Sequence, residues 1–199
     1  MNNNIDWHEI RRKIFHILGG IVLALLVYFD ILNAIIALII VIFGIFLSAL
    51  YKKYDLPIVS YFLNRYEREH LKKKYPGKGV IFLFIAILLM IILFEKNIVI
   101  AGIMIWAFGD AMSAIVGKHY GNTKHPLNIN KSIEGTLAGI FFGTIAASFF
   151  VYWLYALIAC TIAMIVEAID WKIYPDAFDD NLLVPLIGSA VIYLLIIIF

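Results

Sequence analysis

The chain has 199 residues, of which 63% are hydrophobic and 15% charged, and its net charge at pH 7 is +2. Its mean hydropathy of +0.94 is far above that of soluble globular domains, so the composition predicts an integral membrane protein. No basic stripe interleaved with aromatic residues is present, which excludes nucleic acid as a partner. The single cysteine, Cys160, excludes a disulfide within the chain.

Apolar runs recur along the whole chain, and most are close to the ~20 residues that cross a bilayer as a helix. The first run lacks a small-residue cleavage site, so we expect a retained helix rather than a signal peptide. No internal repeat or linker divides the chain, which predicts one all-α domain over 1–199. We expect a polytopic membrane protein with seven transmembrane helices, at about 14–29, 32–50, 80–94, 98–116, 132–150, 152–169 and 182–199. Because the run at 80–94 is short, six transmembrane helices are the alternative.

Lysine and arginine are distributed unevenly over the ends of these helices. Alternate threading of seven spans places all 16 lysines and arginines on one side except Lys96. The positive-inside rule assigns the rich side to the cytoplasm, with the N-terminus inside and the C-terminus outside. If two early spans were merged or one were left out, the basic residues would be distributed over both sides of the membrane. The uneven distribution therefore favours seven spans. The connections on the outer side are short and carry few polar residues. We therefore expect the active site at the cytoplasmic face of the cell membrane, or of the endoplasmic reticulum in a eukaryotic cell.

A carboxylate lies within the fourth apolar run, in the block GDAMSAIVGKHYG at 109–121. Asp110 is expected about two turns before the cytoplasmic end of this helix, where a charge must be paired, bound to an ion or hydrated. It is therefore a candidate functional residue. Gly109, Ser113 and Gly117 recur at fourfold spacing, so a neighbouring helix or a ligand can approach their face closely. The structural alternative is a small-residue helix contact with Asp110 paired to a lysine.

The block KSIEGTLAG at 131–139 opens the fifth expected helix. Ser132 is expected to cap this helix, and the helix dipole favours a carboxylate at Glu134 in its first turn. Capping and close helix packing alone would explain Glu134 and the glycines at 135, 139 and 143. Lysines and free amides at a helix N-terminus also hold phosphate. The P-loop order of glycines and lysine is absent, so the usual soluble nucleotide motif is excluded.

Further carboxylates are expected at the same membrane face. Glu167 and Asp170 share one side of the sixth helix at its end, where the helix dipole disfavours them. Asp179, Asp180 and Asn181 precede the last helix, and Asp180 or Asn181 is the expected N-cap. Magnesium takes few protein carboxylates and completes its shell with phosphate oxygens and water. Carboxylates among lysines therefore predict a site for a magnesium-bound polyphosphate.

The loop at 51–79 is basic and rich in tyrosine. Its simplest interpretation is a surface segment held on anionic lipid head groups. The alternative is that Lys78, at the mouth of the third helix, reaches the phosphate site.

The two central blocks, with EIRRKIFH at 9–16, Glu167 and DDNLLVPL at 179–186, resemble the polyprenol kinase family, which includes dolichol kinase, phytol kinase and the CTP-dependent diacylglycerol kinase. The resemblance preserves order over nearly the whole chain. It implies a CTP-dependent lipid kinase with its nucleotide site on the cytoplasmic side. Matched position by position, the resemblance implies that the site residues are Gly109, Asp110, Gly117, Lys118, Gly121, Lys131, Ser132, Glu134, Gly135, Asp180 and Asn181.

Two other functions stay open. The central block is also similar to that of phosphatidate cytidylyltransferases, which use CTP, but 128–132 departs from their Pro-Lys-Lys-Thr pattern and Arg-Arg-Lys before the first helix favours the kinase. A secondary transporter would also use intramembrane acids and glycine-rich helices. A transporter site usually lies near the middle of the membrane, between repeated halves of the chain. Here the acidic residues are expected at one membrane face and the sequence has no internal repeat, which argues against a transporter.

The expected activity is transfer of the γ-phosphate of CTP to the hydroxyl of a membrane isoprenoid alcohol, such as a dolichol-like polyprenol, giving the lipid monophosphate and CDP. The expected cofactor is Mg²⁺, and the expected partners are the lipid alcohol, CTP and the bilayer, with a homo-oligomer left open. Candidate catalytic residues are Asp110, Lys131 and Glu134; candidate nucleotide-binding residues are Gly109, Gly117, Lys118, Gly121, Lys124, Ser132, Gly135 and Asn181; candidate metal ligands are Asp110, Glu134, Glu167 and Asp180.

Overall fold

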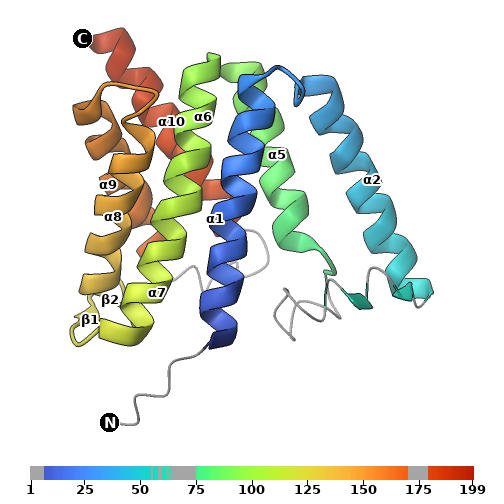
Figure 1. The fold of residues 1–199 in the computed structure, drawn as a ribbon, viewed down its shortest axis with the longest axis horizontal. Coiled ribbons are helices and arrows are strands. Elements are labelled where there is room, and N and C mark those ends of the chain that lie inside the picture. The colour runs from blue at the N-terminus through green and yellow to red at the C-terminus, as the bar shows by residue number, and fades with distance from the viewer. Residues whose placement is uncertain (1–6, 55, 58–59, 62, 64–74, 170–178) are drawn as a thin grey trace.

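The computed structural model describes residues 7–54, 56–57, 60–61, 63, 75–169 and 179–199. Seven helical rods and one short β-hairpin make up most of these residues (Figure 1). The hairpin is antiparallel and pairs Lys124 with Ser132. In chain order the elements are α1 (Trp7–Tyr28), α2 (Ala34–Lys53), α5 (Lys78–Leu93), the continuous rod α6 (Lys96–Met104), η1 (Ile105–Asp110) and α7 (Ala111–Tyr120), the strands β1 (Lys124–His125) and β2 (Asn128–Ser132), and α8 (Ile133–Ala147), α9 (Trp153–Ala168) and α10 (Asp180–Ile198).

The all-helical prediction is confirmed, and each expected span coincides with one rod. Within the described part of the chain, three helices are long and apolar enough to cross a membrane: Ala34–Lys53, Lys96–Tyr120 and Asp180–Ile198. α5, α8 and α9 are shorter apolar helices, and α1 carries charged residues in its first half. The start of α1 and the end of α10 lie at opposite ends of the bundle, as an odd number of crossings requires (Figure 1). The seven crossings and their orientation stay predictions.

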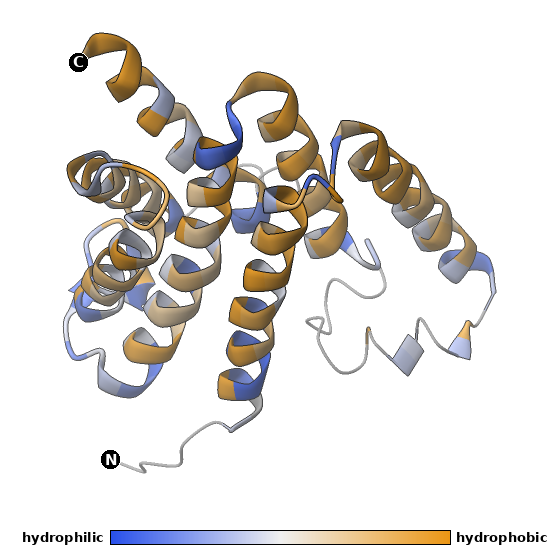
Figure 2. Ribbon diagram, turned by 45° about the horizontal axis from the view of Figure 1, so that its top comes forward, coloured by the Kyte–Doolittle hydropathy of each residue, from blue (hydrophilic) through white to orange (hydrophobic). Residues whose placement is uncertain are grey.

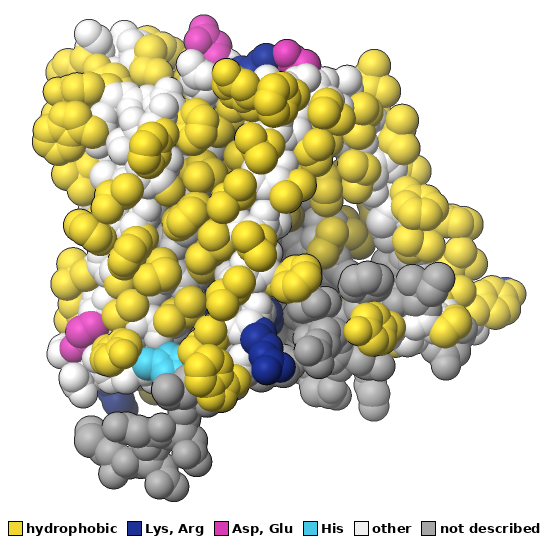
Figure 3. All heavy atoms as spheres, viewed as in Figure 1, with side chains coloured by type: hydrophobic (Ala, Val, Ile, Leu, Met, Phe, Trp, Pro, Cys, Tyr) yellow, Lys and Arg dark blue, Asp and Glu magenta, His cyan; other side chains and the backbone are white. Residues whose placement is uncertain are grey.

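The outer surface of the bundle is apolar. Large hydrophobic side chains are exposed along α1, α2, α8 and α10, among them Phe15, Ile39, Phe141 and Ile197. Hydrophilic residues gather at the ends of the rods (Figure 2), and the charged side chains visible in Figure 3 lie near the upper and lower edges of a largely hydrophobic face. A soluble protein does not expose so much contiguous apolar surface. The chain is a membrane protein.

The rod Lys96–Tyr120 is the centre of the bundle. Two thirds (67%) of its most apolar stretch is buried inside the protein, against 11% for α2. The rod extends one turn beyond the predicted end at 116, because Lys118 and His119 continue the helix outside the apolar run. Its middle, Ile105–Asp110, is a π-helix. Such segments disturb the regular helical register and are frequent at functional sites; here the segment ends on Asp110.

Polar side chains define where three helices begin. Asn33 accepts hydrogen bonds from the amides of Ile35 and Ile36. Ser132 Oγ accepts from the Gly135 amide at 3.1 Å, which confirms the predicted cap of α8. The predicted cap of α10 is wrong by one residue. Asp179 takes that position, because its backbone is extended and its carboxylate accepts from the Asn181 amide at 3.0 Å.

The glycines at fourfold spacing join the central rod to α8. A Cβ on Gly135 would lie 2.6 Å from the Ser113 carbonyl oxygen, and one on Gly139 would lie 2.8 Å from the Gly109 carbonyl oxygen. A Cβ on Gly143 would lie 3.4 Å from Gly109 Cα. Small residues on both helices therefore let the two backbones meet, as in other membrane helix pairs. This contact fixes Asp110 relative to the start of α8.

Candidate active site

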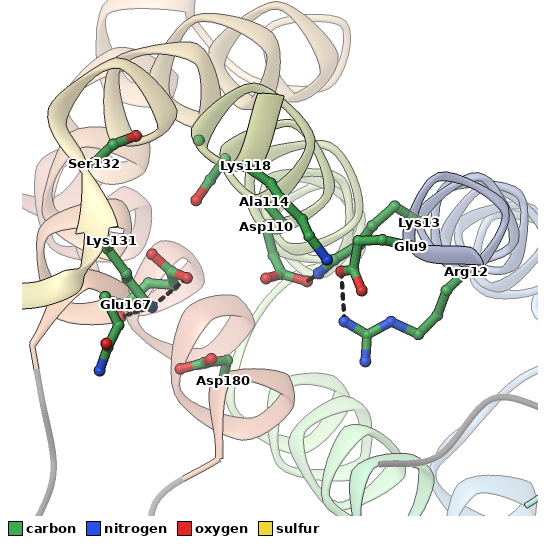
Figure 4. A pocket seen from close by; sticks show the side chains of 13 residues that line it. Glu9, Arg12, Lys13, Asp110, Ala114, Lys118, Lys131, Ser132, Glu167 and Asp180 are labelled. Atoms are coloured by element: carbon green, nitrogen blue, oxygen red, sulfur yellow. Dashed lines mark hydrogen bonds and ion pairs between the residues drawn. The ribbon is translucent and has the colours of Figure 1, made fainter. Parts of the chain in front are cut away.

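A pocket of about 560 Å³ lies at the end of the bundle where α1, α7, β2, α9 and α10 meet (Figure 4). Four carboxylates and four basic side chains face it, so the pocket combines many charges with little net charge. Figure 4 shows Lys131 and Glu167 on one side and Lys13, Glu9 and Arg12 on the other, with the Asp110 and Asp180 carboxylates between them. The lining residues are Glu9, Arg12, Lys13, Asp110, Ser113, Ala114, Gly117, Lys118, Asn130, Lys131, Ser132, Glu167 and Asp180.

Asp110 is paired rather than exposed to lipid. Lys13 Nζ, from α1, donates a hydrogen bond of 2.6 Å to Asp110 Oδ2. His16 Nε2 lies 3.2 Å from the same oxygen. Asp110 and Lys13 are both buried, and a buried carboxylate requires such partners because desolvation of an isolated charge is costly. The pairing to a lysine that the sequence suggested as the structural alternative is therefore present.

Lys131 and Glu167 form the second ion pair of the pocket. Lys131 lies at the end of β2 and donates both to the Glu167 carboxylate and to the Glu167 backbone carbonyl at the end of α9. Glu167 is buried, and its Oε2 atom has no hydrogen-bond partner among the described residues. A buried carboxylate oxygen without a donor is destabilised unless a cation or an ordered water binds it.

Three carboxylates could hold a metal ion together. One oxygen each of Asp110, Glu167 and Asp180 lie within 4.8 Å of one another. Ligands on one octahedral Mg²⁺ lie up to roughly 4 Å apart, so small side-chain rotations would bring the three oxygens to a shared ion. The unpartnered Glu167 Oε2 and the all-oxygen donor set fit a hard divalent cation.

The opposite wall is basic. Arg12 donates to Glu9 at 2.6 Å within α1, while its Nε atom is buried without a hydrogen-bond partner among the described residues. Lys118 of α7 lines the same side of the pocket. With Lys13, these side chains provide the cationic donors that phosphate oxygens bind.

About half of the predicted site residues meet in this pocket. Those that line it are Asp110, Gly117, Lys118, Lys131, Ser132, Glu167 and Asp180. Gly109 and Gly135 lie in the contact between the central rod and α8. Gly121 packs closely against Gly117 and Ser132.

Other predicted residues lie outside the lining. The Glu134 carboxylate accepts from the Thr123 amide at 2.9 and 3.2 Å and so holds the hairpin. Lys124 is exposed on β1. Asn181 accepts from Trp106 instead, and Lys78 lies 3.8 Å from Asp179. Asp170 and most of the basic loop lie outside the described residues.

The site roles of Glu9, Arg12, Lys13 and Asn130 were not predicted. The signal for the first three was the charged segment EIRRKIFH, which has more charge than the start of a membrane helix needs. Nothing in the sequence near Asn130 distinguishes it from a turn residue.

No family model and no solved structure matches the chain. The chain is 34% identical over 193 residues to an uncharacterized protein of Methanocaldococcus jannaschii, covering 92% of each. It is 30% identical over 135 residues to the probable chloroplastic phytol kinase 1 of rice, covering 59% of this chain and 42% of the rice protein. It is 24% identical over 165 residues to the CTP-dependent diacylglycerol kinase 1 of Schizosaccharomyces pombe, covering 72% of each.

At this identity and coverage the chain belongs to one family with the Methanocaldococcus jannaschii protein. The similarity to a phytol kinase and to a CTP-dependent diacylglycerol kinase supports a polyprenol or lipid kinase family of membrane proteins.

Proposed function

We propose that the protein transfers the γ-phosphate of CTP to the hydroxyl of an isoprenoid alcohol in the membrane, giving the lipid monophosphate and CDP. The kinase names of the relatives support the general activity. The observation that carries the proposal is the pocket in which Asp110, Glu167 and Asp180 lie among lysines. Phosphoryl transfer needs this combination, because catalysis rests mainly on positioning and charge neutralisation.

The pocket charges explain why a divalent cation would be required. Among the described residues that line the pocket, basic and acidic side chains are equal in number, so these side chains do not offset the charge of a nucleoside triphosphate alone. Asp110, Glu167 and Asp180 would hold Mg²⁺, which would supply charge neutralisation between phosphate oxygens. Lys13 and Lys131 now neutralise two of these carboxylates. A cation on the carboxylates would leave both lysines free to bind phosphate.

The remaining groups suit the orientation of the two substrates. Lys118, Arg12 and the capped start of α8 would bind the phosphates of CTP. Asp110 would orient the attacking hydroxyl or the cation. The exposed apolar face of α1 next to Arg12 and Lys13, including Ile14 and Leu18, would guide the lipid tail. We place this site on the cytoplasmic side, because the predicted threading collects the basic residues there.

The test is transfer of label from CTP carrying ³²P at the α or the γ position to lipid, with purified protein and magnesium. Polyprenol, geranylgeraniol, phytol, diacylglycerol and phosphatidic acid would be offered in turn. We expect γ label on an isoprenoid alcohol and none from the α position. An α label on lipid would instead identify a cytidylyltransferase, and label on no lipid would refute both enzymes.

Two variants and a matched control tie this activity to the pocket. Asp110→Asn and Lys131→Ala should lower turnover by at least about a hundredfold, as loss of a transition-state contact does. Asp30→Asn changes an acid at the other end of the bundle, in an exposed pair with Lys96, and should leave turnover unchanged. Near-normal turnover of a folded Asp110→Asn protein would show that the site is elsewhere.

A further inference from the structure

Trp106 is buried in the π-helix between two polar side chains from other helices. Its ring centroid lies 3.9 Å from that of His16 on α1, and its indole Nε1 donates a hydrogen bond of 2.9 Å to Asn181 Oδ1 on α10. His16 Nε2 in turn lies 3.4 Å from the Trp106 carbonyl oxygen and 3.2 Å from Asp110 Oδ2. Trp106 and His16 therefore link Asp110 to the first turn of α10.

The link continues to the residue that begins α10. Asn181 donates from its side chain to Asp179 Oδ1 at 2.8 Å and from its backbone to the same oxygen at 3.0 Å. Asp180 lies between these two residues, so fixing Asn181 also fixes the backbone that carries the Asp180 carboxylate. A Cβ on Gly79 would lie 2.8 Å from Asn181 Nδ2, which leaves the amide little freedom to move toward α5.

A shared cation places a strict demand on this geometry. Asp110, Glu167 and Asp180 come from three different helices, and their oxygens must stay within a few ångströms of one another. α9 and α10 pack along their length, which positions Glu167 and Asp180 together. Asp110 belongs to the central rod, and the Trp106–Asn181 hydrogen bond joins that rod to α10 next to the site. Trp106 is only 4% exposed, so an indole N–H without its acceptor would be costly.

We propose that Trp106 and His16 are positioning residues that hold Asp110 and Asp180 at the separation a divalent cation needs. The inference rests on the metal site within the proposed function and does not depend on which phosphate of CTP reacts. Trp106 acts on Asp180 through Asn181, and His16 acts on Asp110 directly. Neither side chain lines the pocket. Their role is to keep the carboxylates in place, since metal affinity depends on groups that orient the ligands.

The test measures Mn²⁺ binding to the purified protein by electron paramagnetic resonance, without nucleotide or lipid and with Mg²⁺ as competitor. Trp106→Phe keeps an aromatic ring but removes the donor, and it should weaken Mn²⁺ binding by about three- to tenfold, as expected for one lost hydrogen bond. Trp153→Phe, an exposed tryptophan on α9, is the matched control and should bind like the unchanged protein.

A double-mutant cycle separates positioning from packing. Asn181→Ala should weaken binding to a similar degree, and adding Trp106→Phe should then have no further effect, because the acceptor is already gone. His16→Gln keeps a donor near Asp110 and should retain most of the affinity that His16→Leu loses. These histidine variants keep the test available if Trp106→Phe fails to fold.

Three results would overturn the inference: no Mn²⁺ binding by the unchanged protein, wild-type affinity in a folded Trp106→Phe variant, or fully additive effects in the cycle. Metal binding is read without a reaction. Failure of label transfer would therefore refute the proposed function while weaker Mn²⁺ binding in Trp106→Phe still supported the positioning role.

Discussion

Lys13 Nζ lies 2.6 Å from Asp110 Oδ2 although 97 residues separate them, and the two side chains are only 8% and 12% exposed. The contact joins the first helix to the centre of the bundle. A buried pair of this kind contributes little net stability. Removal of one partner, however, leaves the other charge buried without a partner and destabilises the protein by about 3–5 kcal/mol. The presence of this pair beside the Glu167 and Asp180 carboxylates is therefore better explained by chemistry than by stability.

Single and double substitutions of this pair should separate stability from activity. Lys13→Met and Asp110→Asn should each destabilise the protein by about 3–5 kcal/mol, because each removes the partner of a buried charge. The double variant should recover most of the loss, since both charges are gone, yet remain inactive. Thermal unfolding in detergent and label transfer from CTP measure the two effects. A double variant as unstable as the two losses summed would show that the pair is not coupled.

The contact between the central rod and α8 should be intolerant of a single methyl group. Gly135→Ala would place Cβ 2.6 Å from the Ser113 carbonyl oxygen, so we expect a loss of about 1–3 kcal/mol from overpacking. Gly19→Ala is the matched control, because a Cβ there would meet nothing within 4 Å, and alanine also favours the helix. Unfolding in detergent compares them. Equal stability of the two variants would mean that α8 can move away without cost.

Helix positions followed from the sequence because apolar runs and breaker residues are local signals. Ser132 was identified as a cap for the same reason. Lys13 was missed as a partner of Asp110, since its distance along the chain hides the contact and a lysine near a helix start has an ordinary interfacial explanation. Glu134 is expected among the charges at one membrane face, but its carboxylate accepts from the Thr123 amide and lies outside the pocket lining. The π-helix at Ile105–Asp110 has no recognisable signal in the sequence.

Two glutamates should respond differently to the same substitution. Glu167→Gln removes a buried carboxylate charge from the candidate metal site, and the magnesium concentration for half-maximal activity should rise roughly tenfold or more. Glu134→Gln keeps an acceptor for the Thr123 amide outside the pocket lining, and this concentration should change less than about threefold. Magnesium titrations of label transfer provide the measurement. A large effect of Glu134→Gln would place a metal ligand on α8, and an unchanged magnesium requirement in Glu167→Gln would remove Glu167 from that role.

The predicted threading can be tested by thiol labelling in intact cells. In a Cys160→Ala background, Asn97→Cys and Phe199→Cys should react with an impermeant maleimide from outside, because the start of α6 and the end of α10 are expected on that face. Lys124→Cys, exposed on the hairpin, should react only after the membrane is opened. Ile39→Cys, on the exposed face of α2, is the control and should stay unlabelled, since a thiol in hydrocarbon does not ionise. Labelling of Asn97 and Phe199 from opposite sides would exclude seven crossings. A full reversal of the pattern would keep the count and invert the orientation, which would move the charged pocket to the outer face and away from cytoplasmic CTP.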